Sequence, residues 1–521
     1  MERLRHIPIH PILFVAFPTF FLLSENISEI RINQIWEPLI FSVVLANLVW
    51  SVINFIIQNR KLSAVTTSVL LLMFFSYVHV DRIFVWAHIP AAFYILIMIG
   101  FSLLITIRIK KSNLKLVKTT LILNIISLTV LIFPSLLISY YEIKRVGETT
   151  WSDLPFSSQE RREEVRKPDV YYIITDSYAS NSSLRDYFNF DNSEFTDYLK
   201  GRGFYIADKS RSNYPFTTPS VASSLNMSYL DKLTEEIRSN SKDATPLIKM
   251  TEDNRVSLYL KSQGYKYYHF GPRLLPTSLN KNADANYTYE SNQIAMSPLT
   301  GLLIEQTILS HLVSSVDCTS STSIFCIGSL NNRKGHYNYI LDQIGKVGDV
   351  VEQPGPKFVF YHNLLTHVPY VFTEDGRYVS RSVEGLKKME ENYITQLKFT
   401  NNVLKQLIET ILNDSENPPV IILQSDEGPY PDDFRKDTAN FEWRQATKDE
   451  LREKFGILNA YYLPGVETKN VLYPEITPVN SFRIVFNEYF KEQLPKLDDF
   501  SYAQTKYHNL YDVFDVTNLM K

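Results

Sequence analysis

The pattern of hydrophobic and polar positions divides the chain into two unlike parts. Long apolar runs dominate residues 1–140, whereas the remainder is charged, tyrosine-rich and alternately patterned. Five apolar segments approach or reach the roughly 20 residues that a helix needs to cross a bilayer. We therefore predict a five-helix transmembrane domain at residues 1–140. The predicted spans lie near residues 8–24, 38–57, 62–80, 84–107 and 117–139.

Charges in the loops between these spans predict their orientation. The N-terminus, the second loop and the fourth loop are basic, whereas the first loop is weighted toward acid. Because basic loops face the cytoplasm, the N-terminus is expected inside and everything after residue 140 outside. Lys144 and Arg145 oppose this orientation, but the more basic fourth loop outweighs them. The span lengths and the alternation of the loops disfavour a soluble helical bundle.

Beyond the spans, the pattern indicates a connector and then a large globular domain. Residues 141–167 carry many charges and no apolar period, which is typical of a juxtamembrane connector. From residue 168, short apolar runs alternate with amphipathic segments, which predicts an α/β domain at 168–521. Its sheet is expected to be mostly parallel and covered by helices on both faces. Strands are predicted at 169–175, 357–365 and 420–423, and helices at 192–204 and 393–412.

Composition narrows the possible functions. A net charge of −3 argues against a general nucleic-acid binder. Two cysteines in the whole chain exclude a disulfide-built scaffold and a cysteine-rich zinc site. Cys318 and Cys326 flank a Ser/Thr-rich stretch, so they are a candidate disulfide outside the cytoplasm, with two free thiols as the alternative.

Three of the predicted strands end in polar residues. Asp176 follows the first strand, His362 and His367 accompany the second, and Asp426 and Glu427 follow the third. One such residue alone is usually a cap or a turn former. Ligands of open α/β sheets bind beyond the carboxyl ends of the strands, so three polar ends on one sheet indicate a site. The adjacent carboxylates Asp426 and Glu427 repel each other unless they face water or share a cation.

The stretch 211–227 adds a fourth polar element. Thr217 and Thr218 precede Pro219, and proline is favoured in the first turn of a helix. One threonine is therefore expected at a helix N-terminus, where backbone N–H groups suit an anion such as phosphate or sulfate. The alternative is that Thr218 is simply an N-cap.

A shared metal ion would explain the paired carboxylates. We predict that Asp176, Thr217, Asp426 and Glu427 bind one divalent cation, whose charge offsets their repulsion. Because all four donors are oxygens, Mn²⁺ or Mg²⁺ is favoured, while Ca²⁺ or Zn²⁺ is possible. A hydroxyl bound to such an ion loses its proton more readily and becomes a nucleophile.

At these residues the sequence resembles the alkaline phosphatase/sulfatase superfamily. It is most similar to the membrane-anchored branch that includes lipoteichoic acid synthases and lipid A phosphoethanolamine transferases. The likeness covers roughly residues 168–465 and, more loosely, the membrane part. Its motifs are Asp176 after the first strand, TTPS at 217–220, THVPY at 366–370 and SDEG at 425–428.

The resemblance implies a role for each matching residue. Thr217 falls on the nucleophile position, Asp176 and Asp426 fall on metal ligands, and His367 falls on the histidine that contacts the substrate and helps the leaving group depart. We also expect His362 and Thr218 to contact the substrate.

Two residues depart from the family pattern. Glu427 stands where a His or Asn is usual, which puts the metal's character in question, and Val221 replaces the sulfatase arginine. Only one acid follows the first strand, so the sequence does not support a second metal site.

The activity that the resemblance implies is transfer of a phospho-head group from a membrane phospholipid to a cell-envelope glycan or polymer. The reaction would pass through a covalent phosphothreonine, outside a multi-pass cell-membrane anchor. Two alternatives stay open: hydrolysis of a phosphate or sulfate ester, and a catalytically degenerate domain that binds a glycan or partner. Glu427 is the residue that keeps the second alternative open.

Overall fold

The computed structural model describes residues 5–27, 30–80, 90, 92–112, 116–146, 167–239, 241–272, 276–287, 297–310 and 333–521. The chain forms two compact units. We call Met1–Gly147 together with Glu290–Gly335 the helical unit, and Glu148–Tyr289 together with His336–Lys521 the α/β unit. Residues 297–310 lie inside the 168–521 region of the sequence but belong to the helical unit.

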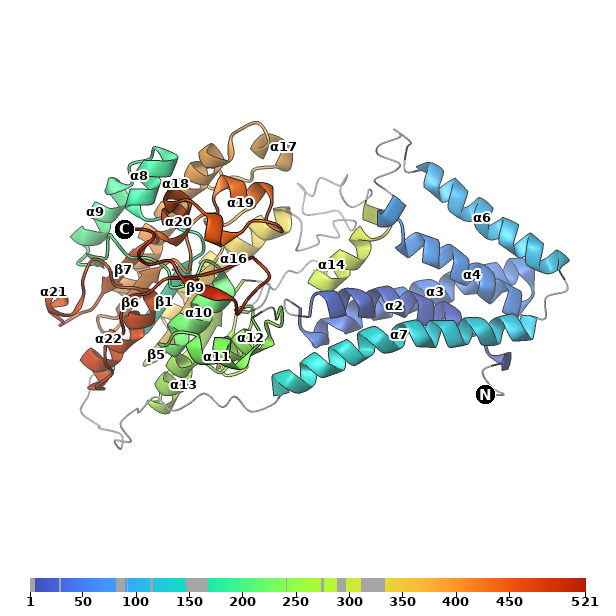
Figure 1. The fold of residues 1–521 in the computed structure, drawn as a ribbon, viewed down its shortest axis with the longest axis horizontal. Coiled ribbons are helices and arrows are strands. Elements are labelled where there is room, and N and C mark those ends of the chain that lie inside the picture. The colour runs from blue at the N-terminus through green and yellow to red at the C-terminus, as the bar shows by residue number, and fades with distance from the viewer. Residues whose placement is uncertain are drawn as a thin grey trace. The chain divides into compact units, whose positions relative to one another are not determined.

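The described residues of the helical unit are mostly helical (Figure 1). Three segments are long and apolar enough to cross a membrane: Ile32–Ile57, Phe93–Lys111 and Leu116–Lys144. The other two predicted spans correspond to α2 and α4, which have only 16 residues each. The described helices of this unit are α2 (His10–Glu25), η1 (Ile32–Ile35), α3 (Trp36–Ile57), α4 (Arg60–Phe75), α6 (Ala92–Lys111), α7 (Leu116–Val146) and α14 (Pro298–Glu305).

A seven-stranded mixed sheet forms the centre of the α/β unit. Its strand order is β2-β7-β6-β1-β5-β3-β4. The neighbours from β6 to β4 pair in parallel, whereas β7 is antiparallel to both β6 and β2. The strands are β1 (Val170–Thr175), β2 (Tyr205–Ile206), β3 (Lys266–Phe270), β4 (Ala285–Asn286), β5 (Lys357–Asn363), β6 (Val420–Gln424) and β7 (Asn459–Tyr462). The prediction of a mostly parallel sheet is confirmed.

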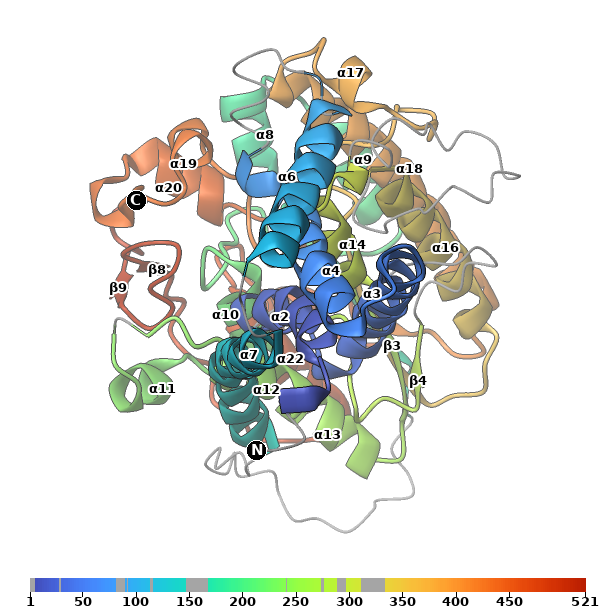
Figure 2. The ribbon, with the colours of Figure 1, turned by 90° about the vertical axis from the view of Figure 1, so that its right-hand side faces the viewer.

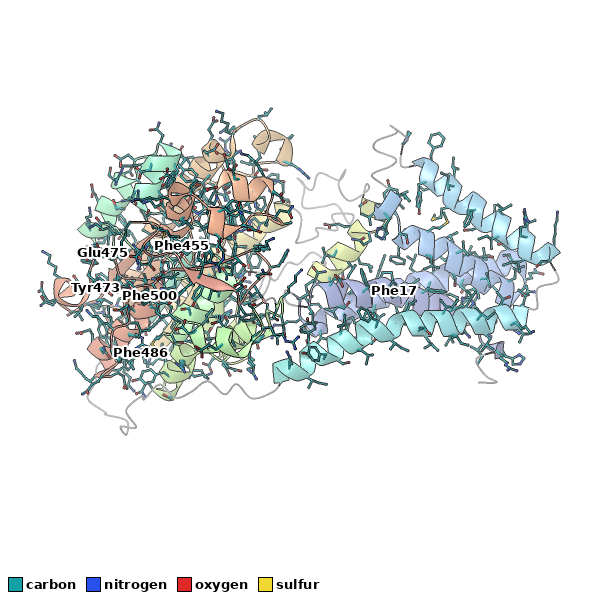
Figure 3. The ribbon with its side chains drawn as sticks, viewed as in Figure 1. Phe17, Phe455, Tyr473, Glu475, Phe486 and Phe500 are labelled. Carbon is teal, nitrogen blue, oxygen red and sulfur yellow. The ribbon has the colours of Figure 1, made fainter. Side chains whose placement is uncertain are left out.

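Both faces of the sheet are buried, because successive side chains of a strand point to opposite faces. On β1, Tyr171 and Ile173 enter one core cluster, while Tyr172 and Ile174 enter another. Phe486 of α22, labelled in Figure 3, belongs to the second cluster. The helices that supply these two clusters are α8 (Asn181–Phe188), α9 (Ser193–Gly201), α16 (Arg333–Val351) and α18 (Met389–Asp414) for the first, and α10 (Thr217–Asn226), α13 (Arg255–Ser262) and α22 (Pro478–Phe490) for the second.

The remaining elements surround this three-layered centre. A third core cluster joins Phe216 to Phe455 at the end of α20, next to the edge of the sheet where the site lies. Figure 2, turned by 90° from Figure 1, labels most of these outer elements. They are α11 (Asp231–Glu236), α12 (Thr245–Glu252), α17 (Arg381–Glu384), α19 (Asp432–Lys436), η2 (Trp443–Gln445), α20 (Lys448–Phe455), α21 (Thr468–Val471) and the two-stranded sheet of β8 (Tyr502–Gln504) and β9 (Val513–Asp515).

Candidate functional site

The carboxyl ends of β1, β5 and β6 bring three predicted site residues together. Ile174 pairs with His362 on one side and with Gln424 on the other. Asp176 and Asp426 therefore both lie two residues beyond the level of His362. The three parallel strands are adjacent in the sheet, so their polar ends converge as the sequence predicted.

Asp176, His362 and Asp426 form a buried cluster with the geometry of a metal site. One donor atom from each residue lies within 4.8 Å of the donors of the other two. His362 Nε2 is 3.5 Å from Asp176 Oδ2 and 3.9 Å from Asp426 Oδ2. All three side chains are almost completely buried.

The unsatisfied atoms of this cluster fit a divalent cation. His362 Nε2 and both Asp426 carboxylate oxygens are buried and have no hydrogen-bond partner within the described part of the chain. His362 Nδ1, by contrast, lies 2.8 Å from Thr277 Oγ1. When Nδ1–H donates to that hydroxyl, the Nε2 lone pair points toward the carboxylates, as in a metal-ligating histidine.

A second histidine, His269, contacts the backbone of Thr277. His269 Nε2 is 2.7 Å from the Thr277 carbonyl oxygen, and His269 Nδ1 is 2.7 Å from the Tyr267 hydroxyl. His269 is thus a buried structural residue. Its contact fixes the segment that carries the Thr277 hydroxyl against His362.

The participation of His362 changes the predicted donor set. From the sequence, His362 is expected to contact the substrate and all metal donors are expected to be oxygens. The cluster instead combines one imidazole nitrogen with two carboxylates, a donor set that suits Zn²⁺ or Mn²⁺ better than Mg²⁺ or Ca²⁺.

Thr217 lies at the N-terminus of α10, beside this cluster. The helix begins at Thr217, and its N-cap is Phe216, which makes no side-chain cap. Thr217 and Thr218 are half-buried, and Thr217 Oγ1 is 3.4 Å from Asp176 Oδ2. The reading of Thr218 as the N-cap is therefore wrong, whereas a threonine at a helix N-terminus is confirmed.

One hydrogen bond fastens α10 to the strand end of β6. Ser220 Oγ donates to the backbone carbonyl of Asp426 at 2.6 Å. The positive end of the helix dipole and the first N–H groups of the helix therefore lie next to the carboxylates, where they favour an anion.

Glu427 has a different partner from the other acids. Its Oε1 is 2.9 Å from Lys454 Nζ, and both side chains are fully buried. Lys454 Nζ also donates to the Gly428 carbonyl at 2.8 Å and lies 3.3 Å from the centre of the Tyr430 ring. The cation beside Glu427 is thus a lysine of the chain itself, and a metal-binding role for Glu427 stays a prediction.

Gly428 explains how Lys454 reaches Glu427. A Cβ at this position would lie 2.4 Å from the Glu453 carbonyl oxygen and 2.7 Å from that of Lys454. Only glycine permits the last turn of α20 to approach the strand end so closely.

Burial governs the protonation of the Glu427–Lys454 pair. It raises the pKa of Glu427 to about 8, although the charge of Lys454 acts in the opposite direction. It also lowers the pKa of Lys454, against the attraction of Glu427. The charge of Lys454 therefore offsets part of the repulsion between Glu427 and Asp426.

The two acids of the cluster shift in opposite directions. Burial and repulsion from Asp176 raise the pKa of Asp426 to about 6. Burial also acts to raise the pKa of Asp176, but the charge of His367 and the hydrogen bond and charge of His362 outweigh it and lower the pKa. Asp176 therefore remains ionised, and Asp426 is the acid that a cation would stabilise most.

His367 is held in the loop after β5. Its ring is half-buried, and Nδ1 lies 2.6 Å from the Val368 carbonyl oxygen. The preceding residue, Thr366, donates its hydroxyl to the Asp176 carbonyl oxygen, which ties the loop to the strand end of β1. His367 is close enough for its charge to act on Asp176, while its contact with a substrate stays a prediction.

Sequence reasoning missed Lys454 and Thr277. The unpaired charge of Glu427 signalled that a cation was needed, but Lys454 stands 27 positions away in an ordinary charged helix. Thr277 lies in an irregular segment with no recognisable pattern. The disulfide candidates Cys318 and Cys326 lie outside the described residues.

No protein-family model and no curated protein matches the chain, whereas solved structures do. The C-terminal periplasmic domain of EcEptC from Escherichia coli has 12% identity and a TM-score of 0.42, covering 68% of this chain and 94% of that one. The corresponding domain of phosphoethanolamine transferase EptC from Campylobacter jejuni has 11% identity and a TM-score of 0.36, covering 63% of this chain and 91% of that one. The 2-O GAG sulfatase BT1596 has 10% identity and a TM-score of 0.37, covering 65% of this chain and 77% of that one. The chain is thus similar in structure to phosphoethanolamine transferase domains and to sulfatases.

Proposed function

We propose that this protein is a membrane-anchored, metal-dependent transferase that moves a phospho-head group from a phospholipid to a cell-envelope glycan or polymer. The observation that supports the proposal most is the cluster of Asp176, His362 and Asp426. His362 Nε2 and both Asp426 oxygens are buried without hydrogen-bond partners in the described structure, and Asp176 Oδ2 is 3.4 Å from the hydroxyl of Thr217 at a helix N-terminus. The similarity to transferases and sulfatases is a likeness in structure and carries no weight in this choice of reaction.

Asp176, His362 and Asp426 would hold the metal, with Thr217 Oγ1 as an additional donor. A divalent cation bound there supplies Lewis-acid stabilisation of phosphoryl oxygens and lowers the pKa of a bound hydroxyl. The nitrogen donor favours Zn²⁺ or Mn²⁺. Thr277 keeps His362 in the ligating orientation, and Lys454 neutralises Glu427.

The side chains divide the chemistry between them. Thr217 Oγ1 reacts as the alkoxide, having released its proton to solvent before the reaction, and is freed as the alkoxide again in the second step. It attacks phosphorus and forms a P–O bond while the bond to the diacylglycerol oxygen breaks. His367 donates a proton to the departing alcohol. In the second step an acceptor hydroxyl gives its proton to His367 and attacks the phosphothreonine, which frees Thr217. The N-terminus of α10, with Thr218, stabilises the charge on the phosphoryl oxygens.

The helical unit would hold this site at the membrane. We propose five spans with the N-terminus in the cytoplasm, so that the α/β unit lies outside. In this topology α2 and α4 cross with the help of flanking apolar residues, since 16 residues rise only about 24 Å. Phospholipid donors present their head groups at the same surface.

Replacing Thr217 tests the proposal. In Thr217→Ala we expect transfer from a labelled phospholipid to fall by at least about 10³-fold, because the covalent step loses its nucleophile. Bound metal and melting temperature should change little. Thr217→Ser, which keeps a hydroxyl, should retain part of the activity. Mass spectrometry of the wild-type protein with lipid alone should find the head group on the peptide that contains Thr217.

Full activity of Thr217→Ala would rule out the proposed mechanism. Release of the head group at the same rate with and without a glycan acceptor would instead assign the protein as a hydrolase, since water would then be the acceptor. A wild-type chain that binds no divalent ion at neutral pH would favour the non-catalytic binding module.

A further inference from the structure

Helix α14 is a segment of the α/β part of the sequence that packs within the helical unit. The chain reaches it after β4 and returns to the α/β unit at α16. Ser297 begins the helix as an N-cap, with its Oγ accepting from the Thr300 N–H at 3.2 Å. An apolar face follows. Leu299 and Leu303, one helical turn apart, are completely buried, while Glu305 is exposed.

The contacts of α14 involve the ends of several predicted spans. The Ser297 backbone N–H donates to Glu37 Oε2 at 2.8 Å, in the first turn of α3. At its other end, the Gln306 carbonyl accepts from the Val78 N–H at 3.3 Å, just past the end of α4. Leu299 shares an apolar cluster with Leu23 near the end of α2.

The charges of the loops predict that all of these span ends lie on the same side of the membrane. The end of α2, the start of α3 and the end of α4 were assigned to the outside from the basic residues at the opposite ends. A helix from the outer part of the chain contacts these same ends. Two independent observations, charge distribution and packing, therefore agree on which end of the bundle faces outward.

We infer that α14 packs onto the outer ends of α2, α3 and α4 and so holds the neighbouring chain at the outer surface of the bilayer. Its buried leucines face the bundle, and Glu305 faces away from it. The apolar residues of α14 are packed and its backbone groups are paired, so the helix is compatible with a position at a lipid surface. The inference rests on the membrane orientation given under the proposed function.

Docking of α14 shortens the tether between the two units. About 21 residue steps separate Val146 from Lys167, which span up to about 75 Å when extended, whereas the about 10 steps from Tyr287 to Ser297 span at most about 36 Å. A docked α14 therefore halves the distance that the α/β unit can move from the outer ends of the helices. That restriction raises the effective concentration of the site at the lipid surface. Use of a lipid donor should thus depend on α14, while use of a water-soluble substrate should not.

A cysteine cross-link tests the position of α14 without reference to activity. In full-length protein with Cys318→Ser and Cys326→Ser, we introduce Val78→Cys and Gln306→Cys, whose backbones are hydrogen-bonded. Oxidation in native membranes should join this pair, because its Cα atoms are close enough for a disulfide. In the control, Gln306→Cys is combined with Phe55→Cys, 18 residues beyond Glu37 on α3 and thus about 27 Å further along the helix. No cross-link between 78 and 306, or equal cross-linking to 55, would overturn the inference.

The functional arm compares lipid-borne and soluble substrates. In Leu299→Ser/Leu303→Ser we expect transfer from phospholipid vesicles to fall at least tenfold, whereas hydrolysis of bis(p-nitrophenyl) phosphate in detergent stays within twofold. The matched control is Leu258→Ser/Leu341→Ser, which changes two exposed leucines and should affect neither activity. Unchanged lipid transfer, or an equal loss of both activities, would contradict the inferred role. A wild-type chain inactive on both substrates would refute the proposed function, and the cross-link would still decide the position of α14.

Discussion

Asp426 and Glu427 are neighbours in the sequence and both are buried, yet their surroundings differ completely. Asp426 faces Asp176 and His362, and neither of its oxygens has a hydrogen-bond partner in the described structure. Glu427 faces Lys454, which balances its charge from within the chain. Glu427 therefore has a cation of the chain beside it, whereas Asp426 belongs to a group of donors that could hold a metal ion.

The two acids lie in a bend beyond the end of β6. The strand ends at Gln424, so residues 426 and 427 are free of its alternating pattern. Ser425 fixes the turn, since its hydroxyl accepts from the Tyr178 N–H at 2.9 Å and donates to the Glu427 carbonyl at 2.6 Å. The comparison shows that two adjacent acids do not establish a two-acid metal site.

Among the variants that distinguish Asp426 from Glu427, Asp426→Asn is expected to change metal binding and activity the most. The variant keeps the shape of the side chain but removes an anionic donor. We expect bound metal to fall well below one equivalent per chain and lipid transfer to fall by more than about 10²-fold, beyond the 10–100-fold typical of residues behind the ligands. Glu427→Gln, the matched change one position away, should keep its metal. Elemental analysis and the transfer assay measure both effects, and equal metal loss in the two variants would show that the acids form one site.

The pairing of Lys454 with Glu427 is tested by measuring the stability of the protein instead of its metal content. Lys454→Met leaves Glu427 buried with no cation, and we expect a loss of about 3 kcal/mol. This is the low end of the range for a broken buried pair, because Glu427 can take up a proton instead. The double variant Lys454→Met/Glu427→Gln should recover much of that loss. Thermal melts of the detergent-solubilised full chain measure the changes. A Lys454→Met variant as stable as the wild type would show that Lys454 does not neutralise Glu427.

The smallest effect concerns the support of His362. Thr277→Val has nearly the same volume but no hydroxyl for His362 Nδ1, so we expect metal affinity to weaken by about 10–100-fold. Thr277→Ser keeps the hydroxyl and should bind like the wild type. Titration of the metal-free protein with Zn²⁺ and with Mn²⁺ measures the affinity. If Thr277→Val and Thr277→Ser bind equally well, the hydroxyl does not orient the ligand.

Local sequence patterns predicted several of the main strands and helices of the α/β unit. The predicted strands at 169–175, 357–365 and 420–423 correspond to β1, β5 and β6, and the helix predicted at 393–412 lies inside α18. These elements could be read from the sequence because apolar periodicity is a local property. Among the described residues, three of the five predicted spans form helices long and apolar enough to cross a membrane.

The sequence by itself determined the two-part organisation, the α/β pattern and the arrival of Asp176, His362 and Asp426 at strand ends. Only the tertiary structure decided that His362 joins the two acids, that Lys454 neutralises Glu427 and that α14 packs with the N-terminal helices. Each of these pairings joins residues far apart in the chain, through helix ends and irregular segments that have no periodic pattern. Such contacts depend on how the layers pack, which neighbouring residues do not encode.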